Sequence, residues 1–229
     1  MFQAVIFDLY NTIAYIQPIR YMETKQKMAA AVNVSMDLFF EIWRQYSRDN
    51  NRGDLLTVEE RVARVLRELG VPANRELIRT LADYEYELQE SGLQLNESSK
   101  NVLEALRDMK LRLGLISNTG FSTENAVDML GIRRYFDCIL LSYKVRALKP
   151  GSFIYQCACE ELQVRPEECL YVGDGDDSEI EGALSVGMYA VLLKEEGRER
   201  ISHTQLAKRY SQLINRLDSV VDIAKTRNS

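Results

Sequence analysis

Five short apolar runs typical of β-strands recur along the chain, and helix-length segments separate the last four of them. The runs cover residues 4–7, 111–116, 138–141, 169–172 and 189–193. One intervening segment repeats apolar residues at helical spacing after residue 98, and another begins after Ser122 and stops at Gly131, a residue type that often ends helices. This alternation predicts an α/β fold in which a Rossmann-like parallel sheet is covered by helices on both faces.

Residues 16–91 interrupt the alternation, because they show helical patterns only. Thr57 and Glu60 form a capping box, in which hydroxyl and carboxylate satisfy backbone N–H groups at the start of a helix. An insert of roughly 75 residues is too long for a simple crossover between strands. We therefore expect an all-helical cap domain of four or five helices at 16–91. The catalytic core is then formed by residues 1–15 and 92–229.

Charge and cysteine content bear on partners and location. The net charge is −5, with 29 Lys and Arg scattered among 34 Asp and Glu, so we expect small-molecule substrates and no nucleic acid. The first residues lack the basic segment of a signal peptide, and no apolar run approaches the ~18 residues of a membrane span. We expect a cytoplasmic protein, either monomer or homodimer, whose four cysteines are reduced. The chain has one histidine, His203, which disfavours catalytic triads and two-histidine metal sites.

Polar residues follow four of the predicted strands, where each strand ends. In parallel sheets ligands bind beyond these carboxyl ends, so the residues should converge there. Two close carboxylates repel each other by ~4 kcal/mol at 4 Å and an effective dielectric constant near 20, so an acidic cluster calls for a cation. All-oxygen ligation suits Mg²⁺. The candidate residues after the first, second, third and fourth runs are, in turn, Asp8 to Thr12, Ser117 and Asn118, Lys149, and Asp174 to Glu179.

These strand-end residues form four motifs in a fixed order. They read Asp8-x-x-x-Thr12, Ser117-Asn118, Lys149-Pro150 and Gly173-Asp174-x-x-x-x-Glu179. In order and rough spacing the chain resembles the haloacid dehalogenase-like hydrolases. The likeness covers nearly the whole core and puts the helical insert where that family carries its cap. One such motif is a weak signal, whereas four in order at strand ends are a strong one.

The resemblance implies a role for each matched residue. Asp8 is the nucleophile and forms a covalent aspartyl intermediate, Ser117 holds a phosphoryl oxygen, and Lys149 neutralises Asp8 and the substrate. Asp174, an Asp8 oxygen and the main-chain carbonyl of Tyr10 bind Mg²⁺, and Glu179 supports the metal through water or hydrogen bonds. Thr12 and Asn118 are expected to contact the substrate. The activity implied is a Mg²⁺-dependent small-molecule phosphatase.

Tyr10 departs from the pattern of the phosphatases in that family, which usually carry a second Asp at this position as general acid and base. Tyrosine, with a pKa near 10, replaces it poorly, and loss of a proton donor typically costs ~10²–10⁴ in rate. The family's 2-haloacid dehalogenases do carry Asp-x-Tyr and act on halogenated substrates, but they lack the acidic run around Asp174. A dehalogenase and a low-activity member with a binding or regulatory role stay open as alternatives.

The predicted cap offers basic residues that can select a substrate. Arg52 lies in a polar loop expected at 49–54 and is the first choice, ahead of Arg20 and Lys25, although most basic residues on a helical lid are solvated. Near the last motif, one of Asp176 and Asp177 is expected to cap the helix that begins near Ser178.

Overall fold

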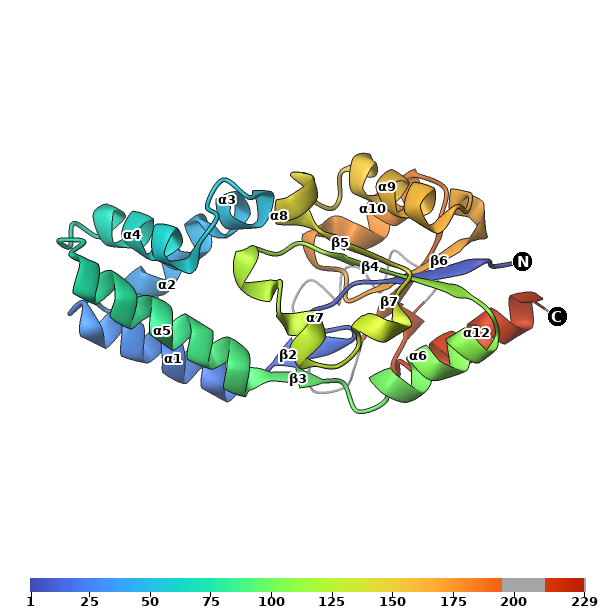
Figure 1. The fold of residues 1–229 in the computed structure, drawn as a ribbon, viewed down its shortest axis with the longest axis horizontal. Helices are drawn as coiled ribbons and strands as arrows, with labels where there is room; N and C mark the ends of the chain where they lie inside the picture. Colours follow the sequence, from blue (N-terminus) through green and yellow to red (C-terminus); the bar gives the residue numbers. More distant parts are fainter. Residues whose placement is uncertain (195–212, 229) are drawn as a thin grey trace.

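The computed structural model describes residues 1–194 and 213–228, which form an α/β part and a helical part beside it (Figure 1). The α/β part is built on one sheet of six parallel strands, in the order β5-β4-β1-β6-β7-β8. Their bounds are β1 (Ala4–Phe7), β4 (Arg112–Ser117), β5 (Cys138–Leu141), β6 (Cys169–Gly173), β7 (Tyr189–Leu193) and β8 (Leu213–Ile214). The predicted α/β class with a parallel sheet is confirmed.

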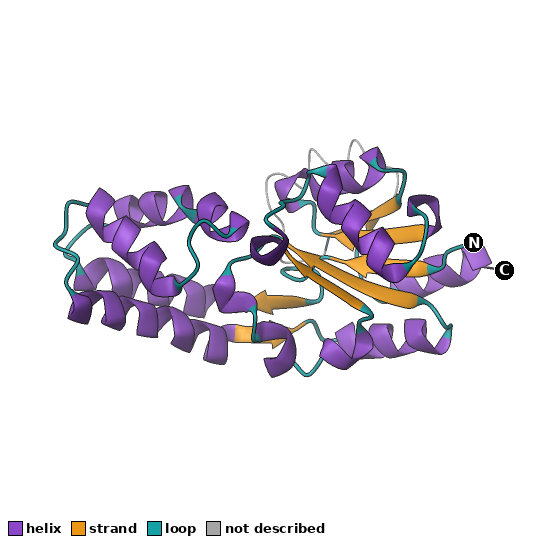
Figure 2. Ribbon diagram, turned by 45° about the horizontal axis from the view of Figure 1, so that its top comes forward, coloured by secondary structure: helices purple, strands orange, loops and turns teal. Residues whose placement is uncertain are grey.

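Strand β1 lies in the interior of the sheet and shows why these apolar runs form strands. Its side chains alternate, so that Val5 and Phe7 join one hydrophobic cluster and Ala4 and Ile6 join another. Helices cover both faces of the sheet (Figure 2). The first cluster includes side chains of α6 (Ser99–Asp108), α7 (Ala126–Met129) and α12 (Ser219–Asn228), and the second those of α9 (Ser152–Leu162) and α10 (Glu179–Ser185).

Short elements complete the α/β part and were harder to foresee. Strand β8 has two residues, too few for a periodic pattern. Between strands lie α8 (Ser142–Val145) and the 3₁₀ helices η1 (Phe121–Thr123), η2 (Arg133–Tyr135), η3 (Pro166–Glu168) and η4 (Asp176–Ser178). The predicted helix after Ser122 is split into η1 and α7, and Gly131 follows in a left-handed conformation at φ +66°.

The helical part lies between two short antiparallel strands, β2 (Ala14–Ile16) and β3 (Leu93–Leu95), which pair with each other. Its five helices are α1 (Pro18–Ala31), α2 (Met36–Gln45), α3 (Ser47–Arg52), α4 (Val58–Glu68) and α5 (Arg75–Gly92). They share a hydrophobic cluster of their own, which includes Met28, Phe39, Trp43, Val62 and Leu81. The sequence patterns predicted helices here and missed the β2–β3 ribbon.

The capping box at the start of α4 is only half formed. The hydroxyl of Thr57 accepts a hydrogen bond from the Glu60 N–H at 3.0 Å, as predicted. The Glu60 carboxylate instead accepts from the N–H of Leu56 at 2.6 Å, one residue before the cap. Two free N–H groups are still satisfied, so the helix begins where the pattern indicated.

A charged side chain is buried inside the helical part. Lys25 is fully buried and pairs with Glu85 of α5. Its ammonium also lies 4.0 Å from the centre of the Trp43 ring, as does the Arg61 guanidinium. Burial lowers the pKa of Lys25 to about 8, against the opposing effect of Glu85. The pair holds α1 to α5 and depends on both partners.

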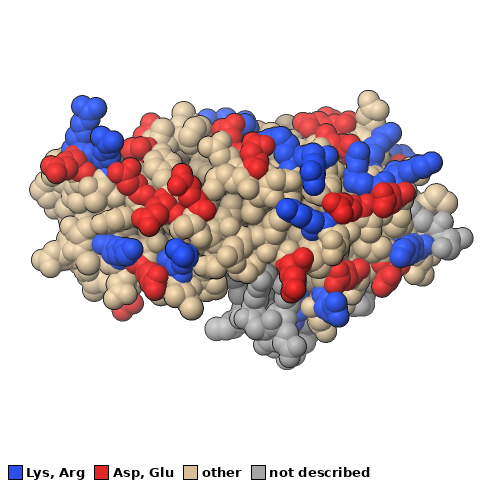
Figure 3. Space-filling view, turned by 60° about the horizontal axis from the view of Figure 1, so that its bottom comes forward, with Lys and Arg blue, Asp and Glu red and all other residues tan. Residues whose placement is uncertain are grey.

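The described surface bears on the predicted partners and location. Over one face Lys and Arg side chains are interspersed with Asp and Glu (Figure 3). None of the helices in residues 1–194 and 213–228 has the length and apolar character needed to cross a bilayer. The single histidine, His203, lies outside the described residues.

Removing Glu85 tests the buried pair. The change Glu85→Gln removes the charge that favours protonated Lys25, so Lys25 releases its proton near pH 7, and we expect a loss of about 1–2 kcal/mol in the free energy of unfolding. The loss should shrink above pH 8, where Lys25 releases its proton. Urea denaturation measures both values, with Glu87→Gln, an exposed change on the same helix, as control. Similar small losses in the two variants would contradict this account.

Candidate active site

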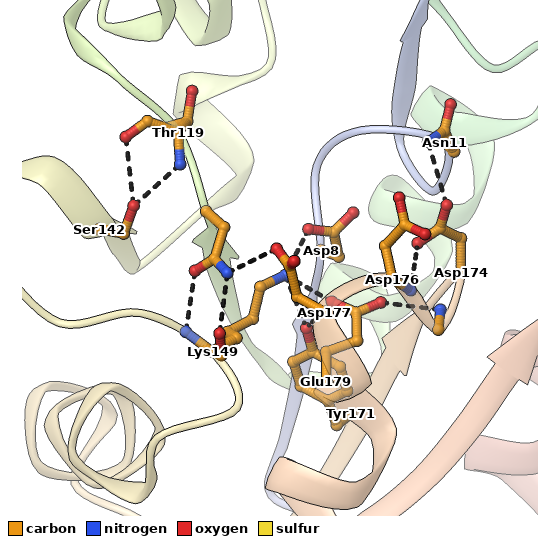
Figure 4. Close-up of polar contacts among 12 residues, drawn as sticks. Asp8, Asn11, Thr119, Ser142, Lys149, Tyr171, Asp174, Asp176, Asp177 and Glu179 are labelled. Atoms are coloured by element: carbon orange, nitrogen blue, oxygen red, sulfur yellow. Dashed lines mark hydrogen bonds and ion pairs between the residues drawn. The ribbon is translucent and has the colours of Figure 1, made fainter. Parts of the chain in front are cut away.

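Polar residues lie at the carboxyl ends of three neighbouring strands, at one edge of the sheet (Figure 4). Asp8 directly follows β1, and its N–H donates to the Val172 carbonyl of β6 at 2.9 Å. Ser117 ends β4, and Asp174 follows β6. Since β4, β1 and β6 are adjacent and parallel, these residues meet around a cavity of about 70 Å³. The cavity is lined by Asp8, Tyr10, Asn11, Ser117, Asn118, Lys149, Asp174, Asp176, Asp177 and Glu179.

Lys149 is the centre of the hydrogen bonds in this cavity. Its ammonium donates to Asp8 Oδ1 at 2.5 Å, to Glu179 Oε2 at 2.5 Å and to the Tyr171 hydroxyl at 3.2 Å. An ammonium has three protons, so all of them are used. Burial by itself lowers the pKa of Lys149, but the charges and hydrogen bonds of Asp8 and Glu179 raise it above its ordinary value. The side chain therefore stays charged.

Glu179 is held by protein donors on both oxygens. Besides Lys149, Oε2 accepts from the Tyr171 hydroxyl at 2.7 Å, and Oε1 accepts from the Gly175 N–H at 3.1 Å. The carboxylate lies so close to Gly173 that a Cβ there would collide with it. Burial, and then the charge of Asp174, raise the pKa of Glu179 while Lys149 lowers it. Held in this way, Glu179 is suited to orient the ammonium group of Lys149.

Negative charge exceeds positive charge in the cavity. Oxygen atoms of Asp8, Asp174 and Glu179 lie within 4.8 Å of one another, and all three residues are buried. Among the described residues that line this cavity, Lys149 is the one cation. Burial raises the pKa of Asp8 well above its ordinary value, against Lys149, and the charges of Glu179 and Asp174 add to the rise. Three oxygen donors around an excess of buried negative charge fit a small divalent cation.

Asp174 is fixed in place by the loop that carries it and by the first motif. Its Oδ1 accepts from the Asp176 N–H at 3.1 Å, and its Oδ2 accepts from the Asn11 side chain at 3.0 Å. Gly175 between them adopts φ +86°, which glycine tolerates best. The expectation that Asp176 or Asp177 caps the next helix was wrong. Helix α10 begins at Glu179 without a side-chain cap, since Asp177 bonds elsewhere.

Asn118 positions the loop of Lys149. Its side-chain nitrogen donates to the Lys149 carbonyl at 2.9 Å and to Asp177 Oδ2 at 2.7 Å, and its oxygen accepts from the Lys149 N–H at 2.8 Å. Asn118 lines the cavity, but protein partners occupy its amide group. The structure therefore favours a positioning role over the predicted direct contact with substrate.

Two buried hydroxyls behave differently from each other. Neither Ser117 Oγ nor Thr12 Oγ1 has a hydrogen-bond partner among the described residues. Ser117 lines the cavity, so its hydroxyl is available to an oxygen of a bound ligand. Thr12 is fully buried and does not line the cavity, because the chain turns at Asn11, where φ is +60°. The structure does not bring Thr12 to the position expected of a substrate contact.

Tyr10 lines the cavity but its hydroxyl bonds to the protein. The hydroxyl lies 2.9 Å from Thr123 Oγ1 of η1 and 3.5 Å from Gln89 Oε1 of α5. Burial raises the pKa of Tyr10 to about 12, and the charge of Asp8 adds to the effect. The phenol therefore keeps its proton near neutral pH and is a weak acid.

The helical part contacts the core through α3. Ser142 of α8 donates to the Asn51 carbonyl at 2.6 Å, and the Asn51 side chain donates to the Asn118 carbonyl at 3.3 Å. Arg146 pairs with Asp54 at 3.0 Å. These contacts close one side of a second cavity of about 660 Å³ between α2, α3 and the core. It adjoins the first, since Asn118, Lys149 and Asp177 line both.

The basic cap residues named from the sequence lie in three different settings. Arg52 lines the larger cavity, but it ends helix α3 where a loop was expected, and its guanidinium pairs with Asp54 and Asp49. Arg20 lines neither cavity. Lys25 is buried in the interior of the helical part, so its expected place at the substrate or on the surface was wrong. A helical pattern alone does not fix how a helix is rotated against its neighbours.

Some residues of the site were missed by sequence reasoning. Tyr171 connects Lys149 to Glu179, and Asn11 holds Asp174. Tyr171 had one detectable signal, since it is the only residue with a polar side-chain oxygen in the apolar run 169–172. Asn11 had none beyond its place inside the first motif.

Comparison with known proteins gives one family and several distant relatives. A family model described as haloacid dehalogenase-like hydrolase matches residues 2–187. The chain is 24% identical to the glyceraldehyde 3-phosphate phosphatase of Methanopyrus kandleri over 206 residues, covering 85% of the chain and 84% of that protein. It is 30% identical to the rhythmically expressed gene 2 protein of Drosophila melanogaster over 123 residues, 52% of the chain and 45% of that protein.

Among solved structures, a 2-haloacid dehalogenase from Pseudomonas syringae pv. Tomato aligns with a TM-score of 0.72. The alignment covers 99% of both chains at 22% identity. At this identity the likeness concerns the fold.

Replacing Lys149 tests the charge balance. In Lys149→Met three buried carboxylates lose their cation, so we expect a loss of about 3–5 kcal/mol in the free energy of unfolding near pH 7.5. Carboxyl groups whose pKa is raised in the folded state bind protons more tightly there, so the loss should be smaller near pH 5.5. Urea denaturation at both pH values checks this, with exposed Lys144→Met as control. A loss that does not change with pH would count against a charge imbalance.

Proposed function

Because this chain belongs to the haloacid dehalogenase-like hydrolases, we propose that it hydrolyses small phosphomonoesters with Mg²⁺, through an aspartyl-phosphate on Asp8. The observation that carries the proposal is the excess of carboxylate over ammonium in the cavity that Asp8 lines. A substrate that brings further negative charge can enter only if a cation accompanies it. The phosphatases among the relatives support the same class of substrate.

In the proposed site the metal is held by Asp174, by an Asp8 oxygen and by the main-chain carbonyl of Tyr10. Glu179 supports the metal indirectly, through water or hydrogen bonds, because its two oxygens already accept hydrogen bonds from Lys149, Tyr171 and Gly175. Bound Mg²⁺ supplies charge neutralisation for the phosphoryl group. Lys149 is fully engaged by three acceptors, so it is not the proton donor. Its charge lowers the pKa of Asp8 against the effect of burial and so favours the ionised nucleophile.

The chain's own residues then carry out two displacements. Asp8 attacks phosphorus in line, the bond from phosphorus to the leaving oxygen breaks, and water later hydrolyses the acyl phosphate. The Ser117 hydroxyl, which has no partner among the described residues, donates to a phosphoryl oxygen. Tyr10 stands where a proton donor is expected and holds its own proton tightly. Turnover should therefore depend strongly on the leaving group.

A second candidate is a 2-haloacid dehalogenase, favoured by Tyr10 and by the dehalogenase among the structures of similar fold. A halide ion needs no proton when it leaves, so a dehalogenase requires no general acid at the position of Tyr10. The excess of negative charge argues against a dehalogenase, since burying three carboxylates without a metal ion is energetically costly. A member of the family without hydrolytic activity, acting by binding alone, is the remaining alternative.

We propose further that residues 16–91 act as a cap domain over the site and exclude water during the reaction. The docking of α3 against α8 supports this role. The proposed substrate is a small molecule, and the protein is proposed to be cytoplasmic, which its four unpaired cysteines support.

Asp8→Asn separates the candidates. The wild type should release phosphate from p-nitrophenyl phosphate when Mg²⁺ is present, and the variant should lose this activity by at least ~10³, since the nucleophile is gone. Mg²⁺ should also raise the melting temperature of the wild type. Chloride release from 2-chloropropionate without metal would support the dehalogenase instead. Inactivity on a wide phosphate panel would favour a binding protein.

Substitutions at Tyr10 test the weak proton donor. Tyr10→Asp places a carboxyl group at this position, so hydrolysis of p-nitrophenyl phosphate should be faster than in the wild type, and hydrolysis of the poorer leaving group in glycerol 3-phosphate should gain most, by ~10². Tyr10→Phe removes only the hydroxyl and should change either rate little. Phosphate release assays on folded variants decide. No gain in Tyr10→Asp would show that proton transfer does not limit the reaction.

A further inference from the structure

Three arginines face the cavity of about 660 Å³ beside the proposed catalytic site. Arg44 lies at the end of α2, and Arg48 and Arg52 lie on α3, so the three recur every four residues along the cap side of the cavity. The volume lies within the roughly 300–1,000 Å³ of small-molecule sites. The core side of the cavity contributes Asn118, Lys149 and Asp177.

Two of these arginines have no acidic partner in the part of the chain that the structure describes. Arg52 pairs with Asp54 at 2.5 Å and with Asp49 at 3.4 Å. Among the described residues, neither Arg44 nor Arg48 forms an ion pair, and the Arg44 guanidinium lies 5.7 Å from the centre of the Phe40 ring. Arg44 and Arg48 line the same cavity from two consecutive helices. The pair therefore presents positive charge that a ligand can neutralise.

The remaining charges of the cavity do not cancel it. Lys149 is already neutralised by Asp8 and Glu179, and Asp177 is bound to the Asn118 amide. Asp177 lies on the boundary with the smaller cavity, which it also lines. The electrostatic arrangement is thus acidic around the proposed metal and basic on the cap side.

We infer that the substrate carries a second anionic group, a carboxylate or a second phosphate, which Arg44 and Arg48 bind in the larger cavity. This rests on the proposed function. The phosphoryl group that is transferred lies in the smaller cavity with Asp8, and the rest of the molecule extends past Asn118, Lys149 and Asp177, which line both. Guanidinium groups suit such anions because they donate paired hydrogen bonds to carboxylate or phosphate oxygens. Closure of the cap on the core then depends on the substrate.

Two matched pairs of substrates test the inference. Glycerol 3-phosphate and 3-phosphoglycerate differ by a carboxylate, and fructose 6-phosphate and fructose 1,6-bisphosphate differ by a phosphate. The wild type should prefer the more anionic member of at least one pair by about tenfold or more in kcat/KM. The pair that shows the preference identifies the anion. In the double variant Arg44→Gln/Arg48→Gln the preference should vanish, while kcat/KM on p-nitrophenyl phosphate stays near the wild-type value.

Control variants separate charge in the cavity from charge on the cap. Arg67→Gln removes an exposed arginine of α4 that does not line the cavity, and it should keep the preference. Arg44→Lys/Arg48→Lys keeps the charges and should restore part of it. Circular dichroism establishes that each variant is folded, and the single variants replace the double one if it is not.

Three outcomes would overturn the inference. They are a wild type with no preference in either pair, a preference that survives in the glutamine variant, and a loss on p-nitrophenyl phosphate equal to that on the anionic substrates. If the wild type releases no phosphate from any compound, the proposed function fails instead. Isothermal titration calorimetry with the Asp8→Asn variant then tests the second-anion site independently of catalysis. Binding of the more anionic member of a pair that is tighter by about tenfold would still support the inference.

Discussion

The ammonium of Lys149 lies between the carboxylates of Asp8 and Glu179, and the rest of the site depends on this buried contact. A buried ammonium is stable only when all of its protons are bonded, and here the third goes to Tyr171. Each partner is held in turn: Glu179 by Gly175 and Tyr171, and the Lys149 backbone by Asn118. The strand ends supply this rigidity, because β1, β6 and β4 are bonded side by side.

The same part of the site contains a further acidic residue, Asp174, at its outer edge. Asp174 is tethered by Asn11 and by the Asp176 N–H, and its carboxylate lies near those of Asp8 and Glu179. Two oppositely charged regions thus lie side by side, with acidic groups at the sheet and arginines on the helical part. Such a polarised site suits a ligand that bridges a cation at one end and guanidinium groups at the other.

Sequence patterns were sufficient for the sheet and the strand-end residues, and insufficient for much of the rest. Runs such as 4–7 and 138–141 are apolar because both faces of their strands are buried, so their bounds could be predicted to the residue. The positions of Asp8, Ser117 and Asp174 then follow from topology. Lys25, Arg44 and Arg52 all lie on helices, where the face that each side chain presents depends on packing between helices. Asn11 acts through Asp174, which lies over a hundred positions away, and Tyr171 acts through Lys149 and Glu179, which lie on other elements, so no local pattern records these contacts.

The β2–β3 ribbon joins the helical part to the sheet through two strands whose ends, Ile16 and Leu93, are directly paired. The chain therefore leaves the core and returns to it at one place, and the core strands keep their register whatever lies between. Such a junction makes the intervening helices an exchangeable module. A different bundle, longer or shorter, could be joined at the same two strands by recombination. Asp8 and Asp174 would keep their places at the strand ends, so recognition and chemistry could diverge separately.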